Sequence, residues 1–162
     1  MPVVSNTSPL LNLSIIDRLD LVRSQFGQVL IPEAVRDELE MDSGRPGAAE
    51  LRTAVSENWI RVQKVETRAH VRTLQRGLDL GESEAIALAA ATNASLLLLD
   101  EREGRKHARA LGLPVTGAIG ILLRAHENGR LPTLRNALDA LQNDAGFWIA
   151  PALRKRILKD VE

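Results

Sequence analysis

The sequence has no cysteine and no tyrosine, and aromatic residues make up only 2% of its 162 positions. Without cysteine the chain has no disulfide, no thiol nucleophile and no thiolate metal site, which suits a reducing compartment. With so few aromatic side chains, a stacking platform for single-stranded bases is not expected. The start carries no basic segment ahead of its short apolar run, so we expect no signal peptide and a cytoplasmic location.

An excess of charge of one sign is also missing. The 21 basic and 21 acidic residues cancel, which argues against a general basic coat for nucleic acid. The basic residues are mostly Arg, and the only lysines are Lys64, Lys106, Lys155 and Lys159. Because Arg binds phosphate and carboxylate in a bidentate way, this bias is compatible with an RNA partner, although a GC-rich genome explains it equally.

Long apolar runs and nucleotide motifs are absent as well. No apolar run approaches the roughly 20 residues of a membrane span, so no membrane partner is expected. Neither a GxGxxG after the first strand nor a Walker loop is present, which excludes the usual dinucleotide and nucleoside triphosphate sites. The three histidines are scattered, and we interpret them as surface residues.

Short apolar strands alternate with helical segments along the chain. We expect strands over 3–6, 29–31, 59–65, 96–99 and 113–117, with a strand-like piece at 147–150. Helices are expected over 8–22, 32–40, 46–57, 67–77, 84–91, 101–112, 118–129, 132–143 and at the end of the chain. Ser8 is a plausible N-cap, with Pro9 in the first turn. The pattern predicts an α/β fold in which a central parallel sheet has helices on both faces, as a single domain over 1–162.

Two of these boundaries carry acids on or beside an apolar segment. Asp100 ends the Leu96–Leu99 strand, where α/β folds bind ligands, although it could instead cap the following helix. Glu84 continues the apolar stripe of Ala87, Leu88 and Ala91 on its helix. A buried charge at this place needs a partner. The alternative is that Glu84 only interacts favourably with the dipole at the helix N-terminus. Glu82 stands three residues after Asp79, as in a capping box.

Further candidates stand at other element ends. Glu38 lies beside the apolar face of its helix, and a solvent salt bridge with Arg36 or Arg45 is the alternative. Asn6 matches Asp100 in its place at the end of an apolar strand. Side chains from such ends could converge, and an all-oxygen cluster suits Mg²⁺ or Mn²⁺ rather than zinc.

Polar neighbours of these residues could complete a site. Thr7 or Ser8 could hold water or a phosphate group. Arg105, one turn past Asp100, could contact a phosphate oxygen or be an ordinary surface charge. Glu101 and Glu103 lie at the start of the helix after Asp100, where acids interact favourably with the helix dipole. Either could also orient the ligands without binding the ion.

Three stretches resemble the PIN-domain family, and in particular its toxin ribonucleases (VapC-like proteins). They are VVSNTSPLLNL, VLIPEAVRDELE and the long stretch from GESEAIALAAATNASLLLLDEREGR to VTG. The likeness is greatest to a branch with NTSPL and GE-x-EAI motifs. The resemblance covers nearly the whole chain, and it departs from the family at Asn6, where an Asp is usual.

The resemblance implies a metal-dependent endoribonuclease that cleaves single-stranded RNA. It implies that Asn6, Glu38, Glu84 and Asp100 hold one or two Mg²⁺ or Mn²⁺ ions, with the fourth place open to Asp100 or an acid just beyond it. It further implies a toxin that forms a homodimer and is inhibited by a small antitoxin. The alternative is a binding or regulatory module of the same fold, catalytically weakened by Asn6.

Overall fold

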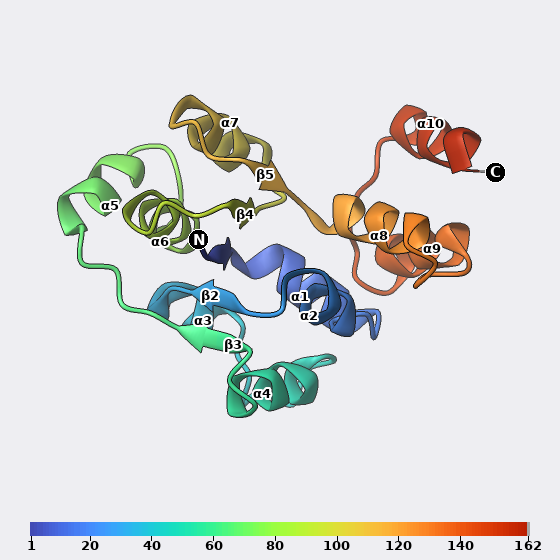
Figure 1. Ribbon diagram of the computed structural model, residues 1–162, viewed down its shortest axis with the longest axis horizontal. Helices are drawn as coiled ribbons and strands as arrows, with labels where there is room; N and C mark the ends of the chain where they lie inside the picture. Colours follow the sequence, from blue (N-terminus) through green and yellow to red (C-terminus); the bar gives the residue numbers. More distant parts are fainter. Residues whose placement is uncertain (162) are drawn as a thin grey trace.

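A five-stranded, fully parallel sheet runs through the molecule, with helices packed around it (Figure 1). The structure, a computed structural model, describes residues 1–161. The strands are β1 (Val3–Ser5), β2 (Val29–Ile31), β3 (Ile60–Val62), β4 (Leu96–Leu98) and β5 (Val115–Thr116). The helices are α1 (Thr7–Ile15), α2 (Asp20–Phe26), α3 (Glu33–Glu38), α4 (Ala48–Ser56), α5 (Arg68–Leu74), α6 (Leu80–Ala91), α7 (Arg102–Ala110), α8 (Ala118–Glu127), α9 (Leu134–Asn143) and α10 (Pro151–Val161). The predicted α/β fold is confirmed.

The order of the strands is β3-β2-β1-β4-β5, so β1 lies in the middle. From β1 the chain builds β2 and β3 on one side, and then crosses over to build β4 and β5 on the other. In open parallel sheets of this kind the ligand crevice lies outside the carboxyl ends of the two strands where the order switches, here β1 and β4. The register pairs Val4 with Leu97, so both strands end at the same edge.

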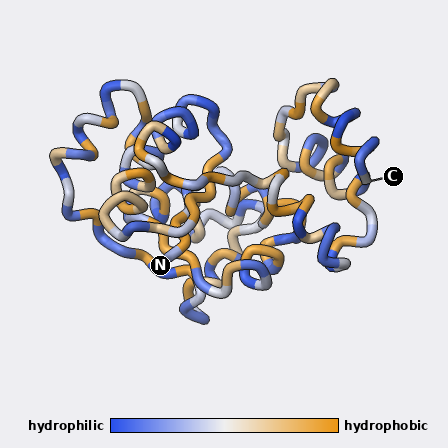
Figure 2. Tube along the Cα trace, turned by 45° about the horizontal axis from the view of Figure 1, so that its top comes forward, coloured by the Kyte–Doolittle hydropathy of each residue, from blue (hydrophilic) through white to orange (hydrophobic). Residues whose placement is uncertain are grey.

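The core forms because most residues of the central strands and of α6 are apolar. Residues 81–89 of α6 are all buried, as expected for an Ala-rich helix that is apolar nearly all round. This helix packs on β1 and β4 and also contacts α3, α5 and α7. In Figure 2 hydrophobic colours predominate along the central strands and hydrophilic ones on the outer loops and helices.

The start of the chain differs from the sequence-based expectation in two ways. The single helix expected over 8–22 is two helices, because Asp17 adopts a left-handed conformation (φ 59°) that interrupts the helical path. Asn6, not Ser8, is the N-cap residue of α1, so Ser8 lies inside the first turn. This shift frees the Ser8 hydroxyl for a tertiary contact.

The strand-like piece expected at 147–150 is not a strand. These residues follow a turn at Gly146 (φ 67°) and lead into α10 without pairing with the sheet. Their alternating pattern reflects an irregular segment in which Ile149 is buried and Trp148 is exposed. None of the described helices has the length and hydropathy that a membrane crossing requires.

The packing of the central strands leads to a first prediction. Leu97 is fully buried in β4, whereas Leu111 is 48% exposed after α7. Leu97→Ala should lower the free energy of unfolding by about 2–5 kcal/mol, because it leaves a cavity. Leu111→Ala should change it by less than about 0.5 kcal/mol. Urea denaturation measures both, and a similar loss in the two variants would contradict the assigned core.

Candidate functional site

Asn6 joins the two strand ends at the switch point of the sheet. Its backbone N–H donates to the Leu98 carbonyl at 2.9 Å, and its side chain is 3% exposed. Its Nδ2 donates to Glu101 Oε2 at 3.3 Å, while its Oδ1 is buried without a hydrogen-bond partner. A buried amide oxygen without a partner costs free energy, so this atom is placed to accept a ligand.

Glu38 reaches the same edge from the end of α3. Its Oε2 accepts a hydrogen bond of 2.5 Å from Thr7 Oγ1, one residue past Asn6. The salt bridges expected as the alternative do not form: Arg36 pairs with Glu33 and Asp37, and Arg45 with Glu40.

The Glu38 carboxylate also lies against the first turn of α6. A Cβ atom at Gly81 would collide with it, so glycine at this position admits the carboxylate. The approach brings Glu38 close to Glu82, whose pKa it helps to raise.

Glu82 is the most perturbed acid of the group. Burial raises its pKa from 4.5 to about 8, and Asp79, Glu101 and Glu38 add to the rise. Asp79 is the N-cap of α6 and accepts from the Glu82 N–H at 2.8 Å, as the capping pattern predicts. The Glu82 side chain, however, faces other acids. Its carboxyl is therefore protonated at neutral pH unless a cation is bound.

Glu101 completes the group as the N-cap residue of α7. Burial raises its pKa, Asp100 and Asp79 raise it further, and the hydrogen bond from Asn6 lowers it. Asn6, Glu38, Glu82 and Glu101 thus come together from four elements at one sheet edge. Of the two acids at the end of β4, the one just beyond Asp100 makes the contact with Asn6.

Asp100 lies beside this group and connects separate elements through hydrogen bonds. Its Oδ2 accepts from Ser8 Oγ at 3.0 Å, and its Oδ1 accepts from the Ala118 N–H at 2.9 Å. It therefore caps α8, not the helix that follows it in sequence. Burial raises its pKa, while both hydrogen bonds and the Arg105 charge oppose the rise. Both carboxylate oxygens are engaged within the protein.

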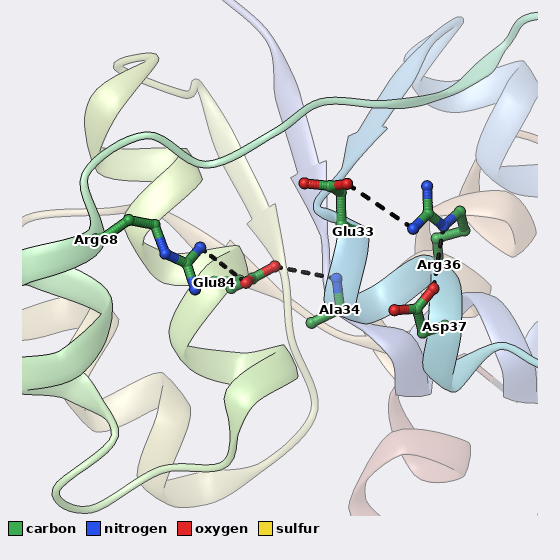
Figure 3. A network of polar contacts seen from close by, with 6 residues as sticks. All are labelled: Glu33, Ala34, Arg36, Asp37, Arg68 and Glu84. Carbon is green, nitrogen blue, oxygen red and sulfur yellow. Dashed lines mark hydrogen bonds and ion pairs between the residues drawn. The ribbon is translucent and has the colours of Figure 1, made fainter.

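Glu84 is placed away from Asn6. It is buried, its Oε1 accepts from the Ala34 N–H at 3.0 Å, and its Oε2 pairs with Arg68 at 2.9 Å (Figure 3). Among the described residues, no polar contact joins it to Asn6, Glu38 or Asp100. Residues two apart on a helix point in directions about 200° apart, so Glu82 and Glu84 cannot both face the sheet edge.

The remaining predicted residues have clear positions. The Thr7 hydroxyl donates a hydrogen bond to Glu38, and the Ser8 hydroxyl donates one to Asp100. Arg105 influences Asp100 electrostatically, and its Nε is buried without a hydrogen-bond partner. Glu103 is exposed in the first turn of α7, where its carbonyl contacts the His107 ring.

The donors at this site are all oxygen atoms, which suits a hard divalent cation. Within residues 1–161, no three Asp, Glu or His side chains stand close enough together to hold a metal ion as they are placed. Binding therefore requires rotation of these side chains. The donor chemistry fits: Asn6 Oδ1 has no partner, and Glu82 stands among like charges that a cation would neutralise.

The raised pKa of Glu82 predicts a pH-dependent stability in the absence of metal. Between about pH 4.5 and pH 8 the folded state holds a proton that the unfolded state releases, so stability falls as pH rises through this window. Glu82→Gln removes this loss. In EDTA at pH 8.5 the variant should be about 1–3 kcal/mol more stable than the wild type, because solvent screens part of the repulsion between the acids. At pH 4.5 this gain should vanish.

Thermal denaturation across this pH range measures the effect. Glu103→Gln, an exposed acid on α7, is the control and should follow the wild-type profile. Parallel pH profiles of wild type and Glu82→Gln would show that Glu82 is not buried among like charges.

Comparison with known proteins identifies the fold family. Among solved structures, the chain is similar to a PilT N-terminus domain protein from the hyperthermophilic archaeon Sulfolobus solfataricus P2. The two share 18% sequence identity and a TM-score of 0.53 over 77% of this chain and 93% of that one, which shows a common fold. A search of curated proteins finds no match. The family model DUF3368, described as a PIN domain, matches residues 2–162, so the chain belongs to this PIN-domain family.

Proposed function

We propose that the protein is a metal-dependent endoribonuclease that cleaves single-stranded RNA with Mg²⁺ or Mn²⁺. PIN domains are generally a metal-dependent nuclease fold, and this supports the reaction class. The observation that carries the proposal is the convergence of Asn6, Glu38, Glu82 and Glu101 at the switch point of the sheet.

Asn6 Oδ1 and the carboxylates of Glu38, Glu82 and Glu101 would hold the cation. When bound, a divalent ion polarises a phosphoryl oxygen and lowers the pKa of its water. The protein orients its own donors: Thr7 holds one oxygen of Glu38, and Asn6 Nδ2 holds one oxygen of Glu101. The proton on the Glu82 carboxyl must leave when a cation arrives, so metal affinity should rise with pH.

Asp100 and Glu84 support this arrangement as positioning residues. Asp100 connects the end of β4 to α1 and α8 through Ser8 and Ala118. Glu84 fixes the start of α3, the helix that ends in Glu38, and pairs with Arg68 from α5. The Arg105 guanidinium lies close enough to Asp100 to lower its pKa and suits a phosphate oxygen of the substrate.

The biological setting is a further part of the proposal. The NTSPL and GE-x-EAI motifs support a VapC-like toxin of a toxin–antitoxin pair, acting in the cytoplasm as a homodimer. A neutral ligand at Asn6 favours the second candidate, a catalytically weakened binding or regulatory module. Its Nδ2 occupies an oxygen of Glu101 that an aspartate would leave to a cation.

Activity assays separate the positions Glu82 and Glu101 from Glu84. Glu82→Gln and Glu101→Gln should each lower RNA cleavage with Mn²⁺ by about a hundredfold or more without lowering the melting temperature, because each removes a charged ligand. Glu84→Gln should lower the melting temperature, since it weakens the buried pair with Arg68.

Fluorescently labelled RNA and calorimetric melting measure the two effects, and Glu103→Gln is the control. Full cleavage by Glu82→Gln and Glu101→Gln, together with loss of cleavage in a stable Glu84→Gln, would place the metal site at Glu84 instead.

Asn6→Asp tests the neutral ligand. An added charge beside a divalent ion at a partly exposed site is worth roughly 1–3 kcal/mol, or about ten- to a hundredfold in affinity. The variant should bind Mn²⁺ more tightly in titration calorimetry and cleave RNA at least as fast as the wild type. Asn58→Asp, in an exposed turn, should leave the affinity unchanged. Unchanged affinity in Asn6→Asp would exclude Asn6 as a ligand.

A further inference from the structure

A groove opens next to the acids, on the far side of Asp100. Its walls come from the start of α7, the connection from β5 to α8, and the segment between α9 and α10. The residues that matter here are Asp100, Arg105, Gly117, Phe147 and Trp148. Figure 1 shows the segment between α9 and α10 passing the start of α8. The groove and the candidate active site therefore share Asp100 as a wall.

Trp148 presents its indole to solvent on this groove. It is 77% exposed, whereas the second tryptophan, Trp59, is 8% exposed. The neighbouring Ile149 is buried and Phe147 is half-buried, and the Phe147 N–H donates to the Leu141 carbonyl at 3.0 Å. The segment is thus anchored on both sides of Trp148. An indole that is carried by an anchored segment and exposed at a groove is a ready stacking surface for a planar ligand.

Arg105 supplies a positive charge to the same groove. Its backbone N–H donates to the Glu101 carbonyl at 3.0 Å, so the two residues lie one turn apart on the same side of α7. Its Nε is buried without a partner, although arginine nitrogens are strong donors. The charge of Arg105 lies close enough to Asp100 to lower its pKa. Arg105 therefore brings a positive charge to the wall of the groove that Trp148 also lines.

The floor of the groove is backbone at α8. A Cβ atom at Gly117 would collide with the Asp100 carboxylate, and one at Gly120 would collide with the Thr116 hydroxyl. The two glycines leave room at the start of α8 for the Asp100 carboxylate and the Thr116 hydroxyl. The Asp100 carboxylate therefore lies against this wall of the groove.

We propose that the groove binds one nucleotide of single-stranded RNA next to the cleaved phosphate, with its base stacked on Trp148 and its phosphate at Arg105. An anionic phosphate and a flat base match the two features of the groove, which are the charge of Arg105 and the exposed indole of Trp148. The inference rests on the proposed function, because it places this nucleotide beside the candidate active site. The sequence made an extended stacking platform unexpected, and one exposed indole suffices for a single base.

Trp148 fluorescence can report on the groove directly. Since the chain has no tyrosine and only two tryptophans, Trp59→Phe leaves Trp148 as the dominant fluorophore. A short single-stranded RNA, added in EDTA so that no cleavage occurs, should quench this emission and protect it from acrylamide. An RNA of the same length with abasic sites should not. Equal signals from the two RNAs, or no signal from either, would overturn the stacking.

Binding measurements on intact RNA test the two side chains. By fluorescence anisotropy in EDTA, Trp148→Ala should weaken binding by about five- to a hundredfold, and Trp148→Phe by much less. Arg105→Gln should weaken binding to normal and abasic RNA alike and reduce its dependence on salt. Leu111→Ala, an exposed apolar side chain elsewhere, is the matched control. Wild-type affinity in Trp148→Ala would overturn the proposal.

The two proposals fail in different ways. If RNA quenches Trp148 but is not cleaved with Mn²⁺, the groove stands and the nuclease function fails. If RNA is cleaved, and Trp148→Ala changes neither its dissociation constant nor KM, the nuclease stands and the groove assignment fails.

Discussion

Glu82 brings a carboxyl group into a buried position beside Glu38, Glu101 and Asp79, and the rest of the site depends on how that charge is tolerated. A buried carboxylate among like charges is costly, so the group keeps its proton until a cation replaces it. The surrounding chain makes room for this arrangement: Gly81 admits Glu38, and Gly104 admits the Glu82 carboxyl. A site that is strained when empty gains stability from whatever cation binds only the folded state.

The acids that face away from this point stabilise the frame. Asp100 and Glu84 each satisfy a backbone N–H at the start of a helix, α8 and α3 respectively. Through these contacts α6 and β4 fix the elements that carry Glu38 and the wall of the groove. Buried carboxylates in this fold thus have two roles. A carboxylate whose oxygens are hydrogen-bonded within the protein holds elements in place, and one that faces other acids is a candidate metal ligand.

The end of the chain adds a feature that the sheet alone does not have. The segment after α9 anchors Ile149 in the core and leaves Trp148 exposed on the groove that Arg105 and Asp100 also line. This segment places an apolar and cationic surface next to the acids at the switch point of the sheet. This combination suits a substrate that is both charged and aromatic.

The alternation of short strands and helices determined the parallel sheet, because only covered strands can be apolar throughout. It also predicted that Asn6 and Asp100 lie at strand ends on one edge of the sheet, and the structure has both residues there. It could not decide between neighbours. Helical spacing favoured Glu84 because its stripe is apolar, but Ala34 and Arg68 satisfy that carboxylate, and Glu82 faces Glu38 and Glu101. Likewise, Glu101 rather than Asp100 contacts Asn6, since Ser8 and Ala118 occupy both oxygens of Asp100. Sequence pattern determines which face of an element is buried, and only the tertiary structure decides which partner a buried charge meets there.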